Sequence, residues 1–115
     1  MDMENNQINY IEFRAKNLDE IKKFYSKAFG WIFTDYGPTY TAFTDGNLDG
    51  GFEFTEDDIV NGVLVVLYHK TLNIIKNKIL EGGGTITKDI FSFPGGKRFQ
   101  FLDPSGNELA IWSDK

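Results

Sequence analysis

The feature of this sequence that most constrains its fold is an internal repeat. Residues 16–22 read KNLDEIK and residues 70–76 read KTLNIIK, which is an offset of 54 positions (70 − 16). The offset continues without a gap through Gly30 and Gly84. A helix start, a glycine stop and the strand after it therefore occur twice, which indicates one structural unit present in two copies.

The hairpin that follows this unit also recurs. It reads FTDGN at 43–47 and FLDPSGN at 101–107, with two extra residues in the second turn. Neither copy has enough apolar surface for a core of its own, so the two must pack together. We therefore expect a single domain over 1–115, with one module at about 7–55 and the other at about 62–113.

Within each module, the pattern predicts a strand, a helix and three more strands. Apolar residues alternate along 8–15, as in a strand with two different faces, and Asn17 followed by Glu20 marks a helix start. Thr71 is the candidate N-cap of the second helix, and the three glycines at 82–84 end that helix. The other predicted strands are 31–35, 40–44, 50–54, 63–68, 85–91, 98–102 and 108–112. The fold class is α+β: two tandem βαβββ modules whose curved mixed sheet surrounds a groove, the usual place for a small ligand.

Composition excludes several classes of function. The chain has no cysteine and one histidine, His69, so thiolate metal sites, cysteine nucleophiles and histidine-rich metal sites are absent. A net charge of −5 argues against nucleic-acid binding. No apolar run is long enough for a membrane span and residues 1–6 do not resemble a signal peptide, so we expect a cytoplasmic protein that does not bind membranes.

The order βαβββ-βαβββ and two local motifs resemble a known family. The motifs are FYSKAFGW at 24–31 and DPSGN at 103–107. Together they resemble the vicinal oxygen chelate superfamily, which includes glyoxalase I, the extradiol dioxygenases and the bleomycin-resistance proteins. The resemblance covers roughly 8–113 and implies the glyoxalase/bleomycin-resistance fold and a homodimer.

In the metal enzymes of that family, His or Glu ligands come from the first and last strands of each module. The resemblance places these positions at Tyr10, Gly50, Leu64 and Ala110. None is a histidine or a carboxylate, and a divalent ion needs several lone-pair donors at once. We therefore expect no metal, no cofactor and no family enzymatic activity, but a protein that binds or sequesters a small molecule.

Strand parity identifies the side chains expected to line the groove. The predicted set is Tyr10, Glu12, Arg14, Phe52, Tyr68, Arg98, Glu108 and Trp112. Phe54 has the same parity, whereas His69 is expected to point away as a surface or capping residue. The aromatic members could equally pack a core or a dimer interface, and the two glutamates could simply pair with the arginines.

Two other functions remain open at the level of sequence. A lyase or dioxygenase could use Glu12 and Glu108 as ligands of a nonstandard metal site. A protein-interaction module with no ligand would use the aromatic residues only for packing.

Overall fold

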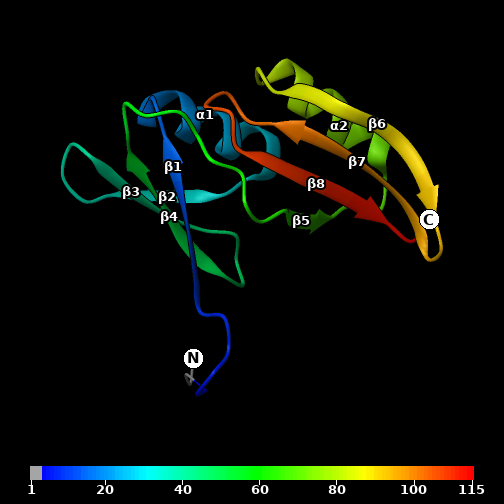
Figure 1. Ribbon diagram of the computed structural model, residues 1–115, viewed down its shortest axis with the longest axis horizontal. Helices are drawn as coiled ribbons and strands as arrows, with labels where there is room; N and C mark the ends of the chain where they lie inside the picture. Colours follow the sequence, from blue (N-terminus) through cyan, green and yellow to red (C-terminus); the bar gives the residue numbers. More distant parts are fainter. Residues whose placement is uncertain (1–3) are drawn as a thin grey trace.

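The computed structural model describes residues 4–115, and its elements follow the predicted repeat (Figure 1). The first module consists of β1 (Tyr10–Ala15), α1 (Leu18–Phe29), β2 (Ile32–Asp35), β3 (Tyr40–Thr44) and β4 (Asp49–Phe54). The second consists of β5 (Val65–Tyr68), α2 (Leu72–Glu81), β6 (Thr85–Phe93), β7 (Gly96–Leu102) and β8 (Glu108–Ser113). The predicted βαβββ-βαβββ order is confirmed.

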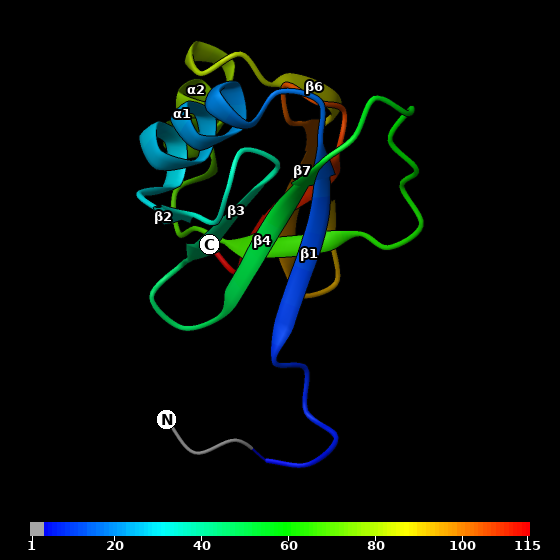
Figure 2. The ribbon, with the colours of Figure 1, turned by 90° about the vertical axis from the view of Figure 1, so that its left-hand side faces the viewer.

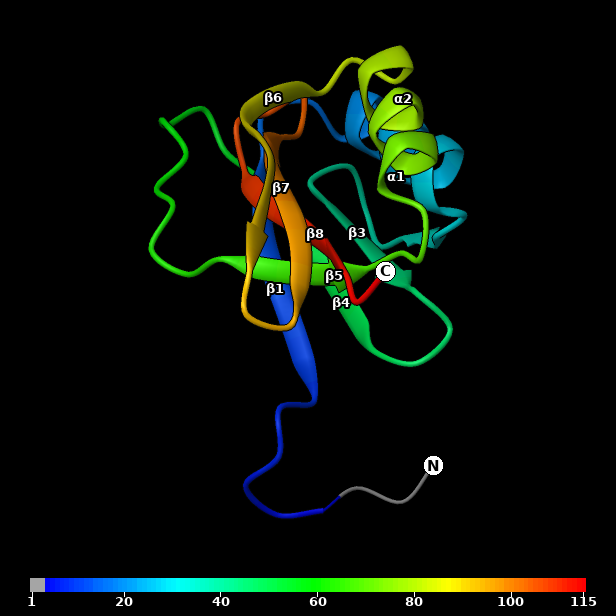
Figure 3. The same cartoon turned by 90° about the vertical axis from the view of Figure 1, so that its right-hand side faces the viewer.

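Each module forms its own four-stranded sheet with the same topology. The strand orders are β1-β4-β3-β2 and β5-β8-β7-β6, with a parallel pair at β1/β4 and at β5/β8 and antiparallel pairs elsewhere. Strands β1 and β5 are edge strands of the two sheets. Figure 3 shows α1 and α2 side by side at one end of the molecule, and Figure 2 shows β1 beside β4 with the segment joining β4 to β5 looping outward.

An ion pair between the helix and the strand that follows it is duplicated along with the fold. Lys22 of α1 lies 3.0 Å from Asp35 of β2, and Lys76 of α2 lies 2.6 Å from Asp89 of β6. Both members of the second pair follow those of the first by the same 54 positions. The repeat therefore preserves a contact between side chains as well as the order of the elements.

The two helices begin and end differently despite the repeat. The side chain of Asn17 accepts a hydrogen bond from the backbone of Glu20 at 3.0 Å, whereas Thr71 occupies the N-cap position of α2 without a side-chain cap bond. Gly30 ends α1 at a φ of 74°, a left-handed conformation that favours glycine. The corresponding positive φ in the second module, 98°, is at Gly83.

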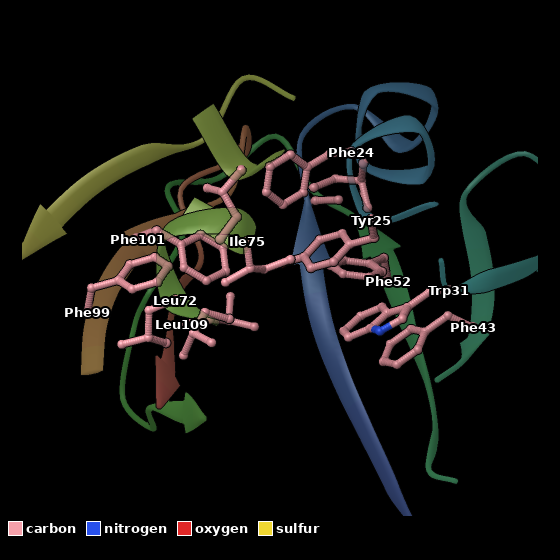
Figure 4. Close-up of a cluster of buried hydrophobic side chains, with 14 residues drawn as sticks. Phe24, Tyr25, Trp31, Phe43, Phe52, Leu72, Ile75, Phe99, Phe101 and Leu109 are labelled. Atoms are coloured by element: carbon pink, nitrogen blue, oxygen red, sulfur yellow. The ribbon is translucent and has the colours of Figure 1, made fainter. Parts of the chain in front are cut away.

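The core joins the helix sides of both sheets (Figure 4). Its largest fully buried side chains come from both modules: Phe24, Tyr25 and Phe52 from the first, and Phe99 and Phe101 from the second. Within residues 4–115, no helix is long and apolar enough to cross a membrane.

Candidate functional site

Strand β1 divides its side chains between two faces of the first sheet. Phe13 stacks on Phe52 at 5.1 Å and Ala15 is fully buried, so these residues face the helices. Because side chains alternate along a strand, Tyr10 and Glu12 project from the opposite side. We call the side of each sheet away from the helices its open face.

A chain of hydrogen bonds links two tyrosines and a glutamate on the first open face. The Tyr40 hydroxyl donates to Glu12 Oε1 at 2.9 Å, so the 2.5 Å contact between the Tyr10 and Tyr40 hydroxyls is a hydrogen bond from Tyr10. Burial, followed by these two hydrogen bonds, raises the pKa of Tyr40 well above its ordinary value. Tyr40 therefore remains a protonated donor at any physiological pH.

Gly51 makes room for this chain. It pairs with Glu12 across β1 and β4, and a Cβ atom there would lie 2.1 Å from the Tyr40 hydroxyl and 2.6 Å from the Tyr10 hydroxyl. Any side chain at this position would displace the tyrosines. Arg14 continues the same face and pairs with Glu53 at 3.6 Å, with both side chains about half exposed, so the pair adds little stability.

The second open face holds a polar network around Glu108. Its Oε2 accepts from Thr87 Oγ1 at 2.8 Å and from Gln100 Nε2 at 3.3 Å. Gln100 Oε1 in turn accepts from Arg98 Nη2 at 3.2 Å. The Arg98 guanidinium also lies 5.3 Å from the centre of the Phe91 ring. Glu108 and Arg98 are therefore linked through Gln100.

Tyr68 and Trp112 lie beside each other on this face. They pair in register across β5 and β8, and their rings meet edge to face at 5.2 Å. The Tyr68 hydroxyl donates to Asp114 at 2.6 Å, and this hydrogen bond is the main cause of a raised pKa of Tyr68.

A cleft of about 600 Å³ joins parts of the two open faces, and we call it the open-face cleft. Four of the predicted groove residues line it: Tyr10, Glu12, Arg14 and Glu108. The other four do not: Phe52, Tyr68, Arg98 and Trp112. Both modules thus contribute a carboxylate to one cleft.

The segment between β4 and β5 forms one wall of the open-face cleft. Asn61 fixes this segment to the second module, because its Oδ1 accepts from the backbone of Glu108 at 3.0 Å and its Nδ2 donates to the Gly106 carbonyl at 2.9 Å. Val60 and Val63 line the same cleft, with exposed fractions of 90% and 81%. Asn61, Tyr40 and Gly51 had no signal in the sequence that marked them as site residues, since their positions depend on strand register and on loop folding.

Two predicted positions on β4 lie on the other side of the sheet. Phe52, expected in the groove, is fully buried against Phe13 on the helix side. Gly50, expected to match Ala110, pairs with Ile11, and a Cβ there would lie 2.4 Å from the Phe43 ring.

The cause is a one-residue error in the predicted correspondence of β4 with β8, which are related by 59 positions (110 − 51) and not by 60 (110 − 50). Glu12 pairs with Gly51, and Val66, its counterpart 54 positions later, pairs with Ala110. Gly51 is therefore the true counterpart of Ala110. A shift of one residue moves every side chain of a strand to the other face.

His69 lies on the helix side, as its parity predicts. Its Nδ1 accepts a hydrogen bond from the backbone of Thr71 at 2.9 Å, just before α2. The bond goes to the N-cap residue itself, so His69 lies at the start of α2 as expected but caps none of its helical N–H groups.

Comparison with known proteins identifies the family. The family model described as the Glyoxalase/Bleomycin resistance protein/Dioxygenase superfamily matches residues 7–111. The chain belongs to this superfamily. No curated protein sequence matches it significantly.

Solved members of the glyoxalase superfamily share the fold at low sequence identity. A glyoxalase/bleomycin resistance protein/dioxygenase family enzyme from Burkholderia phytofirmans has a TM-score of 0.82 and 15% identity, covering 93% of this chain and 98% of its own. A putative glyoxalase family protein from Bacillus anthracis has a TM-score of 0.75 and 18% identity, covering all of both chains. The fosfomycin resistance protein of Listeria monocytogenes, solved with Mn(II) and 1S,2S-dihydroxypropylphosphonic acid, has a TM-score of 0.81 and 12% identity, covering 94% and 90%.

The metal site of the superfamily's enzymes does not fit the residues of this chain. With the register corrected, the four positions are Tyr10, Gly51, Leu64 and Ala110. Three of these side chains have no lone pair to donate. Across residues 4–115, no three His, Asp or Glu side chains are grouped so that they could hold one ion.

Proposed function

We propose that this glyoxalase-superfamily chain is a metal-free protein that binds or sequesters a small molecule in the open-face cleft, and that it does so in the cytoplasm. The observation that carries the proposal is the convergence of Tyr10, Glu12 and Glu108, from both modules, on one cleft of about 600 Å³. Ligand pockets fall between about 300 and 1,000 Å³. The four positions that hold the metal in the superfamily's enzymes do not form a set of metal ligands in this chain, which supports a metal-free function.

The side chains of the open-face cleft favour a ligand with a cationic or N–H donor group. Glu12 and Glu108 present two carboxylates, whereas Arg14, the only basic lining residue in the described part of the chain, already pairs with Glu53. The exposed apolar surface of Val63 and its neighbours would cover a flat or aliphatic body. Planar amine-bearing antibiotics and metabolites combine these properties.

We also propose that the chain forms a homodimer, as the family resemblance implies. Strands β1 and β5 each leave one edge unpaired, and such edges usually acquire a partner or a cover. Ile8, Val60 and Val63 lie along the same gap with 80%, 90% and 81% of their surfaces exposed. A homodimer that covers this apolar surface would enclose the cleft. Sedimentation of a monomer at all concentrations would contradict this part.

Isothermal titration against a panel of planar amines tests the binding function. At least one member should bind, and Glu12→Gln and Tyr40→Phe should each weaken that binding roughly tenfold, the usual cost of losing a charge-assisted hydrogen bond. Glu56→Gln, an exposed carboxylate outside the cleft, is the matched control and should leave affinity unchanged. Absence of binding across the panel, or equal loss in the control, would refute the proposal.

A metal-dependent lyase or dioxygenase is the second candidate, because Glu12 and Glu108 line the same cleft. Elemental analysis of the purified protein separates the two functions. One divalent ion per chain that disappears in Glu12→Gln would favour the enzyme. A metal-free protein that still binds a member of the amine panel would favour the binding function, and one that binds nothing would favour an interaction module.

A further inference from the structure

A second cleft lies on the helix side of the gap between β1 and β5, and we propose that it binds an amphipathic anion, a carboxylate carried on an apolar body. Its volume is about 750 Å³, and it is lined by the end of α1, by β1 and β5, and by α2. We call it the inner cleft. It shares Ile11, Phe13 and Val65 with the open-face cleft but has different charges. The proposal does not depend on the function proposed for the open-face cleft.

The walls of the inner cleft are apolar surfaces that the core leaves partly uncovered. Phe13 and Phe29 on one side and Val65 and Leu67 on the other pack against the core but are only half-buried. Trp31 is 7% exposed and also lines the cleft; Figure 4 shows it beside Phe43, at the end of the core away from Phe99. An apolar ligand body would remove the remaining surface from water, which is favourable.

The rim of the inner cleft is basic, although the chain is acidic. Lys27 and Lys78 line it, and neither pairs with a carboxylate among residues 4–115. The chain as a whole has 17 Asp and Glu against 12 Lys and Arg. Two lysines without partners beside apolar walls are complementary to an anion with an apolar tail.

The other charged or titratable side chains in this cleft, Tyr68, His69 and Asp45, are consistent with that ligand. The Tyr68 hydroxyl donates to Asp114 at 2.6 Å and carries no charge. His69 uses Nδ1 to accept from the backbone of Thr71, so the proton of its neutral ring is on Nε2, where it serves as a donor. Asp45 is the only acidic residue of 4–115 that lines this cleft, and its Oδ1 accepts from the backbones of Asn47 and Leu48 at 2.8 and 2.6 Å. Asp45 therefore has a structural role in the turn between β3 and β4.

Tryptophan fluorescence tests the proposal directly. The chain has two tryptophans, Trp31 in the inner cleft and Trp112 on the open face of the second sheet, so Trp112→Phe leaves Trp31 as the only reporter. The probes are 11-bromoundecanoate, whose bromine quenches tryptophan on contact, and 11-bromoundecanol, which has the same tail without the charge. Saturable quenching by the acid, with an apparent affinity roughly tenfold above that of the alcohol, is expected.

Substitution of the rim lysines identifies the source of that preference. The double variant Lys27→Gln with Lys78→Gln should bind 11-bromoundecanoate roughly tenfold more weakly and should bind 11-bromoundecanol with unchanged affinity. The control double variant, Lys23→Gln with Lys97→Gln, makes the same charge change outside the cleft and should leave the affinity for both probes unchanged. All four lysines are on the surface, so both double variants should fold, which circular dichroism would verify.

Three results would overturn the proposal. Quenching could be linear and alike for acid and alcohol, or both lysine pairs could reduce it equally, which would indicate a general effect of charge. Alternatively, the two cleft lysines could lower helix stability without changing probe affinity, which would limit them to a role at the ends of α1 and α2. A dimer in sedimentation whose Trp31 is not quenched would show that a second copy, and not a small anion, fills the cleft.

Discussion

The Tyr25 hydroxyl of α1 donates a buried 2.8 Å hydrogen bond to Asp103 Oδ2, in the turn between β7 and β8, and so connects the two modules through their shared core. Asp103 Oδ1 accepts three backbone N–H bonds within its own turn, from Ser105, Gly106 and Asn107. Asn107 then reaches the Arg14 carbonyl of β1 at 2.7 Å. The DPSGN motif thus fixes the second module to both α1 and β1.

Loss of the Tyr25 hydroxyl should destabilise the whole chain. Tyr25→Phe keeps the ring in the core but leaves one Asp103 oxygen without this donor, at a cost of about 1–3 kcal/mol. Urea unfolding should show a lower midpoint with an unchanged slope. Tyr36→Phe, on a 65% exposed side chain, is the control and should change the free energy of unfolding by less than about 0.5 kcal/mol. Equal effects would contradict the connecting role.

Acid should weaken the protein through the duplicated ion pairs. The hydrogen bond from Lys22 is the main cause that lowers the pKa of Asp35, and that from Lys76 has the same effect on Asp89. A carboxyl whose pKa is lower in the folded state adds stability above its unfolded pKa of about 4, and this stability is lost as pH falls through the folded value. Asp35→Asn with Asp89→Asn should therefore flatten the acid limb of a stability profile between about pH 5 and pH 2.

Asp57→Asn is the control for that profile, because Asp57 is an exposed carboxyl with no basic partner among the residues described. Its acid limb should match that of the parent. Asp103 acts in the opposite direction, since burial raises its pKa, so its contribution makes the fold more stable as pH falls through the raised folded value towards about 4.

Neighbouring glycines on β4 should respond differently to alanine. At Gly50 a Cβ would lie 2.3 Å from the Ile11 backbone oxygen and 2.4 Å from the Phe43 ring, so Gly50→Ala should cost about 3 kcal/mol or more. At Gly51 the nearest atoms are the ends of tyrosine side chains, which can move. Gly51→Ala should keep the fold but separate Tyr10 from Tyr40.

Thermal unfolding measures the loss of stability expected in Gly50→Ala. Ultraviolet titration of the tyrosines measures the separation of Tyr10 from Tyr40 expected in Gly51→Ala. Gly51→Ala should lower the pKa of Tyr40 towards its ordinary value, because displacement would expose the hydroxyl and remove its partners. Equal loss of stability at both glycines would contradict the assignment of the two faces.

Removal of the Asn61 side chain should loosen the wall of the open-face cleft. Asn61→Ala loses the bonds to Gly106 and Glu108, at a net cost of about 1 kcal/mol or less each at this exposed site. Hydrogen exchange should become faster in residues 56–63 and stay unchanged in the helices. Asn73→Ala, on the exposed side of α2, should leave this segment unaffected. Unchanged exchange in Asn61→Ala would show that other contacts hold the wall.

Several parts of this protein follow from the sequence because they depend on local interactions. The 54-residue offset predicts both helices, their starts and the order of strands, since caps and hydrophobic periods act over a few residues. Alternation along 8–15 separates Tyr10 and Glu12 from Phe13. It predicts which groups share a face without reference to any other strand.

Tertiary structure decided which strand faces meet, and this is where the sequence prediction for Phe52 and Gly50 failed. Their side of the sheet depends on the pairing of β4 with β1, and one residue of register reverses it. That pairing brings Gly51 to Tyr10, and the pairing of β3 with β4 brings Tyr40 there, although the two residues are 41 and 30 positions away in the sequence. The sequence determined the two modules, because each is built from short-range signals, whereas the two clefts exist only because long-range pairing and packing set β1 beside β5 with a gap between them.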